Sequence, residues 1–256
     1  MSAVAVSHVV TGRPDGPVVV LSNSLGATWE MWDFNLAELE KHFRVVRYDT
    51  RGHGDSPVPA GPYDLDDLAD DVVMLLDDLS VERAHFVGLS LGGMTGMRLA
   101  AREPDRVDRL VLLCTSALLE PASAWYDRAA LVRAEGTRAV APAVVGRWFT
   151  AGYRERHPRR RRYAESMVAG TPPEGYASCC EAIATMDLTT DLASIKAPAL
   201  VIAGADDPAT PPDHLARIAD GIADGRLLVV PDAAHLASVQ QPTAVTSAVL
   251  EHLVAS

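Results

Sequence analysis

The sequence has few of the features that mark several specialised classes of protein. Its 256 residues include only three cysteines and 5% aromatic residues. Three is an odd number and two of them, Cys179 and Cys180, are adjacent, which favours reduced thiols over a framework of disulfides. No CxxC, HExxH or GxxxxGK pattern is present, so we expect neither a metal nor a bound nucleotide.

Long apolar runs and a basic N-terminal segment are also missing. The longest apolar stretches are short, such as residues 110–114 and 197–203, against the roughly 20 residues that span a bilayer. No basic residue precedes Arg13, so the chain does not begin like a secretory signal. We therefore expect a cytoplasmic protein that does not insert into a membrane.

Basic residues are outnumbered by acidic ones. The chain has 23 Lys and Arg against 34 Asp and Glu, a formal net charge of −11, which argues against nucleic acid as a partner. The imbalance is uneven, because residues 121–165 hold ten arginines and four acids. That segment therefore carries +6, and the rest of the chain carries −17.

Short β-branched runs recur along the chain and predict strands at residues 8–10, 18–22, 44–49, 84–88, 109–114, 199–203 and 226–230. Helical patterns lie between most of them, the clearest at residues 63–79. Seven aspartates between Asp64 and Asp78 lie opposite its apolar face, and we interpret them as a solvated helix flank rather than a metal site. Alternating strands and helices predict an α/β fold with a mostly parallel, doubly wound sheet.

The alternation stops between about residues 118 and 187, where strand signals disappear and Ala, Arg and Glu recur at helical spacing. We expect an inserted helical cap there. The predicted organisation is one core domain, residues 1–117 and 188–256, interrupted by a cap at 118–187.

The segment Gly88-Leu89-Ser90-Leu91-Gly92-Gly93 follows a predicted strand and opens a predicted helix. This is typical of a nucleophile elbow, in which a sharp turn exposes the apical serine. The turn forces a strained backbone at Ser90, so the flanking residues have to be small, as the glycines are. Ser90 is therefore the candidate nucleophile.

A serine hydroxyl needs a base, and the base needs an acid to orient it. In this kind of sheet, ligands gather beyond the carboxyl ends of the strands. His235, which follows the strand at 226–230 after a short loop, fits the base best. Either Asp206 or Asp207, just after the strand at 199–203, could be the acid.

The remaining histidines have simpler interpretations. His53 also follows a strand and competes for the role of base, but its glycine-flanked loop indicates a tight structural turn. His85 lies within a predicted strand, His157 in the cap, and His214 and His252 on helical patterns, so we expect structural or solvated roles.

A tetrahedral intermediate also needs preorganised hydrogen-bond donors. The backbone N–H of Leu91, directly after the nucleophile, is one candidate. The second is expected from the loop at residues 22–26, and we choose the N–H of Ser24.

These residues resemble the α/β-hydrolase superfamily over nearly the whole chain, including the chain order Ser, Asp, His. Within it, the sequence is similar to the 3-oxoadipate enol-lactonases. The segments that carry the resemblance are 21–26, 48–54, 88–94, 147–150, 176–183 and 207–212.

The resemblance implies roles for individual residues. The family's spacing between a glycine and a proline, matched by Gly204 and Pro211, selects Asp207 as the acid. Ser24 and Leu91 inherit the oxyanion role, and Leu25 and Trp148 are expected to contact the substrate. The N-terminus is short for the family's first strand, so the sheet is expected to have seven or eight strands.

The implied reaction is hydrolysis of 3-oxoadipate enol-lactone, a small anionic lactone, in the protocatechuate branch of the β-ketoadipate pathway. It needs no cofactor and no metal. Ser90, rather than an aspartate, at the elbow argues against dehalogenase or epoxide-hydrolase chemistry. For the substrate carboxylate we choose Arg147 over the arginine run at 159–162.

Two other functions stay open at this point. One is a broad small-ester carboxylesterase or cofactor-free perhydrolase with the same triad, which substrate profiling would distinguish. The other is a ligand receptor on the same fold, which a turnover measurement on the enol-lactone would distinguish. The sequence carries no signal for an oligomeric state.

Overall fold

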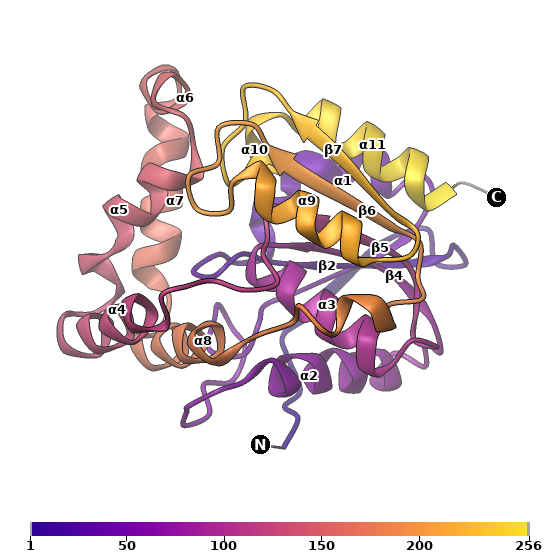
Figure 1. Cartoon of the computed structure of the whole chain (residues 1–256), viewed down its shortest axis with the longest axis horizontal. Helices are drawn as coiled ribbons and strands as arrows, with labels where there is room; N and C mark the ends of the chain where they lie inside the picture. The colour runs from indigo at the N-terminus through magenta and orange to yellow at the C-terminus, as the bar shows by residue number, and fades with distance from the viewer. Residues whose placement is uncertain (1, 255–256) are drawn as a thin grey trace.

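The computed structural model describes residues 2–254 and contains one seven-stranded sheet in that range (Figure 1). The strand order is β1-β3-β2-β4-β5-β6-β7, with β1 antiparallel to β3 and every other neighbouring pair parallel. All seven predicted strands are confirmed. They are β1 (His8–Gly12), β2 (Val18–Ser22), β3 (Arg44–Tyr48), β4 (Ala84–Leu89), β5 (Val107–Leu113), β6 (Ala199–Gly204) and β7 (Gly225–Val230).

Helices cover both faces of the sheet, which is why the central strands β4 and β6 are buried along their whole length. On one face lie α2 (Leu65–Asp78), α3 (Leu91–Arg102) and α9 (Pro212–Gly221). On the other lie α1 (Asp33–Leu39) and α11 (Pro242–Val254), with the short α10 (Ala237–Gln240) beside them. Short 3-10 turns, η1 (Trp29–Trp32) and η3 (Leu192–Ser194), precede α1 and β6. Within residues 2–254, every helix is too short or too polar to cross a bilayer.

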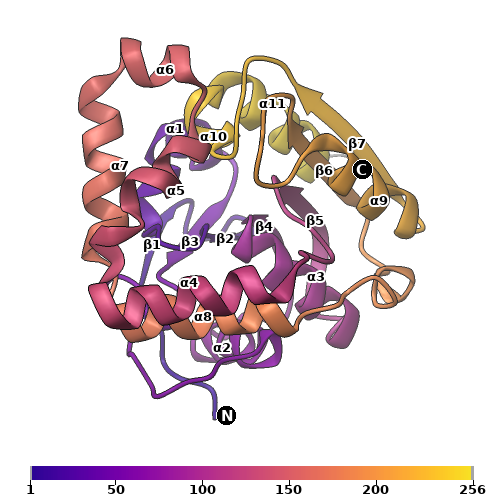
Figure 2. The same cartoon turned by 60° about the vertical axis from the view of Figure 1, so that its left-hand side comes forward.

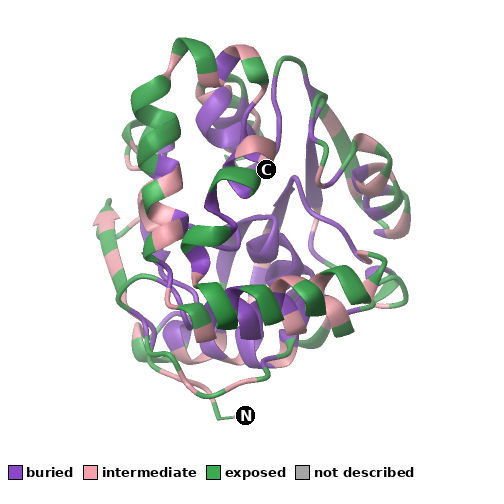
Figure 3. Ribbon diagram, turned by 90° about the vertical axis from the view of Figure 1, so that its left-hand side faces the viewer, coloured by how far each residue is buried: buried purple, intermediate pink, exposed green. Residues whose placement is uncertain are grey.

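The chain between β5 and β6 is helical, as the loss of strand signals predicts. It forms α4 (Ala122–Glu135), η2 (Thr137–Ala139), α5 (Ala141–Trp148), α6 (Ala151–Arg156), α7 (Pro158–Gly170) and α8 (Pro173–Thr185). Helix α4 packs along α8, and α5 packs on α7 (Figure 2). We call residues 122–185 the cap. Its outward surfaces are largely exposed, whereas the central strands behind it are buried (Figure 3).

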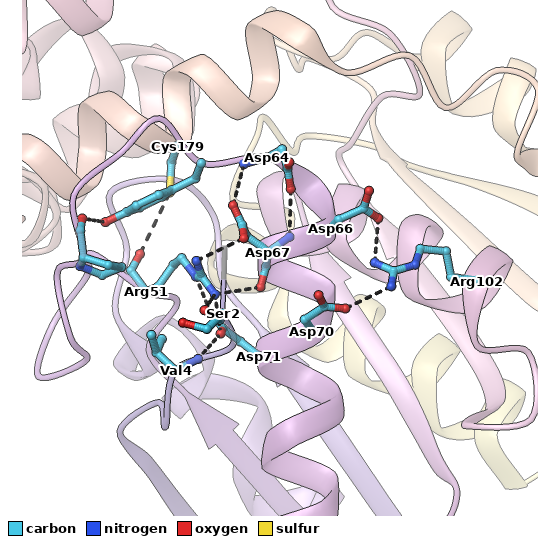
Figure 4. Close-up of polar contacts among 12 residues, drawn as sticks. Ser2, Val4, Arg51, Asp64, Asp66, Asp67, Asp70, Asp71, Arg102 and Cys179 are labelled. Carbon is cyan, nitrogen blue, oxygen red and sulfur yellow. Dashed lines mark hydrogen bonds and ion pairs between the residues drawn. The ribbon is translucent and has the colours of Figure 1, made fainter.

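The prediction of a wholly solvated aspartate flank on α2 is wrong for Asp67 and Asp71, which are 2% and 1% exposed. Both face the buried guanidinium of Arg51, which makes two hydrogen bonds of 2.6 Å to Asp71 and lies 3.5 Å from Asp67 (Figure 4). Asp64 caps the helix instead, accepting from the Asp67 N–H. The helical pattern could not reveal this, because the cation comes from the loop after β3.

The cysteines are free and buried within the described chain, as expected. Cys179 contacts the Arg51 carbonyl through its sulfur, at 3.9 Å (Figure 4). Burial raises the pKa of the Cys179 and Cys180 thiols, so both stay protonated. Cys179 is a packing residue that joins the cap to the core.

Candidate active site

Ser90 occupies the sharp turn between β4 and α3. Its φ of 58° and ψ of −115° lie in a region that L residues rarely adopt. The turn can close because Gly88 and Gly92 have no Cβ. A Cβ at Gly88 would collide with the Gly92 carbonyl, and one at Gly92 would collide with the Ser22 carbonyl. The Ser90 N–H donates to the Leu113 carbonyl at 2.9 Å, which fixes the turn to β5.

His235 and Asp207 form a direct pair. The His235 Nδ1 lies 2.8 Å from Asp207 Oδ2, and both side chains are buried. The two residues come from the loops after β7 and β6, which pair in parallel so that Gly204 lies opposite Val230. This parallel register is what places the two loops side by side.

The carboxylate of Asp207 is held in its ionised form. Its Oδ1 accepts from the N–H groups of Ala209 and Thr210, and its Oδ2 accepts from the Thr210 hydroxyl at 2.7 Å. Burial raises the pKa of Asp207, but His235 and these donors outweigh burial, so the pKa lies below its usual value. Asp206, by contrast, is exposed and contacts the His235 loop only through its backbone.

The loop after β2 lies against the elbow. The Gly92 N–H donates to the Asn23 carbonyl at 2.9 Å, and the Asn23 side chain accepts from Trp32 Nε1 at 3.0 Å. The Ser24 N–H donates to the Met31 thioether, with 3.4 Å between nitrogen and sulfur. Within residues 2–254, no acceptor is found for the N–H of Leu25.

His53 is a structural residue of this loop. Its Nε2 accepts from the Gly26 N–H at 2.9 Å, and its Nδ1 lies 3.2 Å from the Arg51 carbonyl. Complete burial lowers the pKa of His53 to about 4, so the ring is neutral at pH 7. With both ring nitrogens engaged, His53 supports the loop and has no free nitrogen for a base.

A small cavity of about 50 Å³ brings most of the predicted residues together. Six of them line it: Ser24, Leu25, Ser90, Arg147, Trp148 and His235. Pockets for drug-sized ligands have volumes of roughly 300–1,000 Å³, so this cavity suits a small substrate. The cap also contributes lining residues that the sequence did not single out, among them Trp125, Arg128 and Tyr176.

Two cationic side chains border this cavity. No carboxylate of residues 2–254 forms an ion pair with Arg128 or Arg147. Burial and the neighbouring charge of Arg128 lower the pKa of Arg147, although arginine stays charged at neutral pH. Burial raises the pKa of the Tyr176 phenol beside them, which keeps it a neutral hydrogen-bonding group. An anion would relieve the repulsion between the two guanidinium groups.

The cavity, the elbow and the pair of His235 and Asp207 form the arrangement of a hydrolase on a doubly wound sheet. Residues 17–242 match the family described as alpha/beta hydrolase fold. The chain belongs to that family. Its seven-stranded, mostly parallel sheet is the fold predicted from the sequence.

Relatives within the family point to ester and lactone hydrolysis. The chain is 41% identical to 3-oxoadipate enol-lactonase 2 of Acinetobacter baylyi, covering 96% of this chain and 92% of the relative. The crystal structure of the enol-lactonase from Burkholderia xenovorans LB400 superposes with a TM-score of 0.96 at 44% identity, covering 98% and 96% of the two chains. A putative carbamate hydrolase, RutD of Variovorax paradoxus, is 36% identical over 96% of this chain and 95% of the relative. This α/β hydrolase is an enzyme that hydrolyses an ester or lactone.

Proposed function

We propose that the enzyme hydrolyses 3-oxoadipate enol-lactone to 3-oxoadipate, as a cytoplasmic step in the protocatechuate branch of the β-ketoadipate pathway. The observation that carries this choice is a pair of cations, Arg128 and Arg147, which border the same cavity as Ser90 and form no ion pair with a carboxylate of residues 2–254. A neutral ester needs no such pair, whereas the enol-lactone carries a carboxylate. The name of the Acinetobacter baylyi relative supports the same substrate, and the name of the Burkholderia xenovorans enzyme supports the class of enol-lactones.

In the proposed mechanism, Ser90 Oγ attacks the lactone carbonyl while His235 Nε2 accepts the hydroxyl proton. Asp207, bonded to Nδ1, holds the ring in the tautomer that leaves Nε2 free and stabilises the imidazolium. The ring C–O bond then breaks and the leaving enol oxygen takes the proton from His235. The enol tautomerises to a ketone, and a water molecule, activated by His235, releases the acyl group from Ser90.

The oxyanion that forms in each step needs two N–H donors. Leu91 supplies one from the first position of α3, where the helix dipole also favours negative charge. For the second donor we assign Leu25 in place of Ser24. The Ser24 N–H already donates to Met31, whereas no acceptor within residues 2–254 competes for the Leu25 N–H.

The substrate carboxylate is assigned to the cap side of the cavity. Arg147 lies at the end of α5 beside Trp148, and Arg128 extends from α4 over the Trp125 ring at 4.6 Å. Guanidinium groups bind carboxylates through two parallel hydrogen bonds, and the neutral Tyr176 hydroxyl adds a third donor. Trp148 supplies an apolar wall against the lactone ring.

The test is a substrate comparison with the purified enzyme. We expect rapid hydrolysis of enzymatically generated enol-lactone and at least about 100-fold lower kcat/KM for an uncharged lactone of similar size and for a simple carbamate. Equal kcat/KM for the charged and uncharged lactones would reject the anion-binding role and leave a broad esterase. A preference for the carbamate would transfer the assignment to the activity named for the RutD relatives.

A further inference from the structure

A second, larger hollow lies directly behind one wall of the active-site cavity. It is a groove of about 320 Å³ between α7 of the cap and the segment formed by η1 and α1. Its lining is mainly apolar and aromatic, including Met31, Phe34, Trp148, Phe149, Met167 and Leu236. We call it the rear groove. It is about six times the volume of the cavity that holds Ser90.

The two hollows share a wall. Trp148 lines both of them. Met31 lines the rear groove, while its sulfur accepts the N–H of Ser24, which lines the active-site cavity. Leu236 lines the groove directly after His235, and its N–H donates to the Trp148 carbonyl at 2.9 Å. Trp148 therefore separates the two hollows directly, and Met31 and Leu236 line the groove next to Ser24 and His235 of the cavity; we call these three residues the wall.

Met31 is the adaptable member of this wall. Trp148 and Leu236 are tied together through their backbones, and the indole is large and rigid. A methionine side chain is unbranched and flexible, and an N–H to thioether contact is weak. Met31 is only 3% exposed and is packed between Ser24 and the rear groove.

We propose that Met31 sets the upper size limit of the acyl group, and that the rear groove is an acyl-chain subsite reached when Met31 turns aside or is shortened. The ligand class is an ester with an unbranched apolar acyl chain whose carbonyl sits at Ser90. The leaving alcohol has to lie near His235 to receive its proton. Met31 contacts Ser24, whose loop is proposed to bind the oxyanion of the acyl carbonyl. A substrate chain that extends toward Met31 is therefore the acyl chain and not the alcohol.

This inference rests on the proposed role of Ser90 and not on the identity of the lactone. The test therefore uses p-nitrophenyl acetate, butanoate, hexanoate and octanoate with the whole enzyme. Wild-type kcat/KM is expected to fall at least 10-fold from acetate to hexanoate. In Met31→Ala the ratio of hexanoate to acetate is expected to rise at least 10-fold, since a single methylene changes selectivity by roughly 10-fold or more in an apolar pocket.

Two control variants isolate the size of the side chain. Met31→Leu keeps the apolar bulk and removes the sulfur acceptor, so it is expected to keep the wild-type chain-length profile. Met186→Ala makes the same truncation at another buried methionine, 6% exposed, that lines neither hollow, and it is also expected to keep that profile. If Met31→Ala does not fold, judged by its melting transition, Met31→Val gives a smaller opening for the same comparison.

Two results would overturn the inference: an unchanged hexanoate-to-acetate ratio in the folded Met31 truncation, or an equal change of that ratio in Met31→Leu. Inactivity on the enol-lactone would reject the proposed substrate but leave this comparison intact. Wild-type enzyme that hydrolyses no ester would reject both.

Discussion

The backbone N–H of Leu236 donates to the carbonyl of Trp148 at 2.9 Å, joining the end of cap helix α5 to the loop that carries His235. The His235 N–H lies 3.5 Å from the preceding carbonyl, that of Arg147. Backbone hydrogen bonds thus hold Arg147 and Trp148, which are proposed to bind substrate, next to His235, which is proposed to transfer protons. A displacement of α5 would displace His235 with it.

Gln240 reinforces this connection, and its loss is expected to impair catalysis. Its Oε1 accepts from the N–H groups of Ala234 and Thr150, and its Nε2 donates to the Thr150 hydroxyl and the Asp232 carbonyl. Gln240→Ala leaves the N–H groups of Ala234 and Thr150 without an acceptor, at about 1–3 kcal/mol each when buried. We expect kcat to fall about 10-fold and the melting temperature to drop, measured by steady-state kinetics and thermal unfolding.

Gln241→Ala is the matched control for Gln240. Gln241 donates to the same Asp232 carbonyl, at 3.1 Å, but makes no side-chain hydrogen bond to the cap. We expect less than a twofold change in kcat. Equal losses in the two variants would show that the cap connection does not position His235.

Ser90→Ala is expected to abolish nearly all hydrolysis without unfolding the protein. The change deletes a single hydroxyl from a small side chain and leaves its Cβ in place, so thermal unfolding should match wild type. Residual catalysis of roughly 10³–10⁴-fold over water can persist from the oxyanion donors and binding. Activity within 10-fold of wild type would eliminate Ser90 as the nucleophile.

The two adjacent aspartates give a sharper test of the triad. Asp207→Asn should lower kcat by roughly 10⁴-fold, because an amide cannot hold His235 in the required tautomer. Asp206→Asn removes an exposed carboxylate and should lower kcat less than threefold. The reverse order in a steady-state comparison would move the acid to Asp206.

Most of the fold could be predicted from local patterns in the sequence. The β-branched run at Val18–Ser22 becomes a strand with the same ends, because a parallel strand covered on both faces needs an apolar run and little else. The elbow could also be predicted from a short segment, because Gly88, Gly92 and Gly93 lie close to Ser90 in the chain. His235 could be predicted because it follows a strand, whereas the position after β6 left Asp206 and Asp207 both open and only the family resemblance selected Asp207.

The contributions of distant segments could not be read from the sequence. Arg128 and Tyr176 meet at the cavity only because α4 packs along α8, and their positions in the chain are 48 residues apart. Met31 lies in η1, and nothing in its neighbourhood indicates a contact with Ser24. Asp67 and Asp71 show the same effect, since a buried Arg51 overrides the helical pattern of α2.

His53 is expected to make the protein less stable in mild acid. In the unfolded chain His53 takes up a proton near pH 6.5, whereas in the folded chain its pKa is about 4. The unfolded state therefore binds more protons between these values, so the free energy of unfolding falls as pH drops through that window. The full difference corresponds to about 3 kcal/mol.

His53→Gln tests this contribution, because the amide can still accept from Gly26 and donate to the Arg51 carbonyl. We expect the stability gap between wild type and this variant, measured by urea unfolding, to narrow from pH 7.5 to pH 4.5. Asp49 is common to both proteins, so its own raised pKa, about 6 through burial, cancels in the comparison. A gap that stays constant with pH would mean that His53 does not remain neutral in the folded state.

The net charge of −11 makes binding of an anionic substrate depend on local charge, and this predicts a specific response to salt. Arg128 and Arg147 border the cavity, and the exposed run at residues 159–162 adds positive potential on α7. Salt screens such fields over about 8 Å at physiological ionic strength. We expect kcat/KM for the enol-lactone to fall as salt is added, while kcat/KM for p-nitrophenyl acetate stays nearly constant.

Arg147→Ala should raise KM at least 10-fold for the lactone and less than twofold for the neutral ester. Arg162→Ala, which changes the exposed run, should weaken only the response of kcat/KM to salt. Parallel salt curves for the two substrates, together with equal KM changes in Arg147→Ala, would leave the cap arginines without a role in recognising the carboxylate.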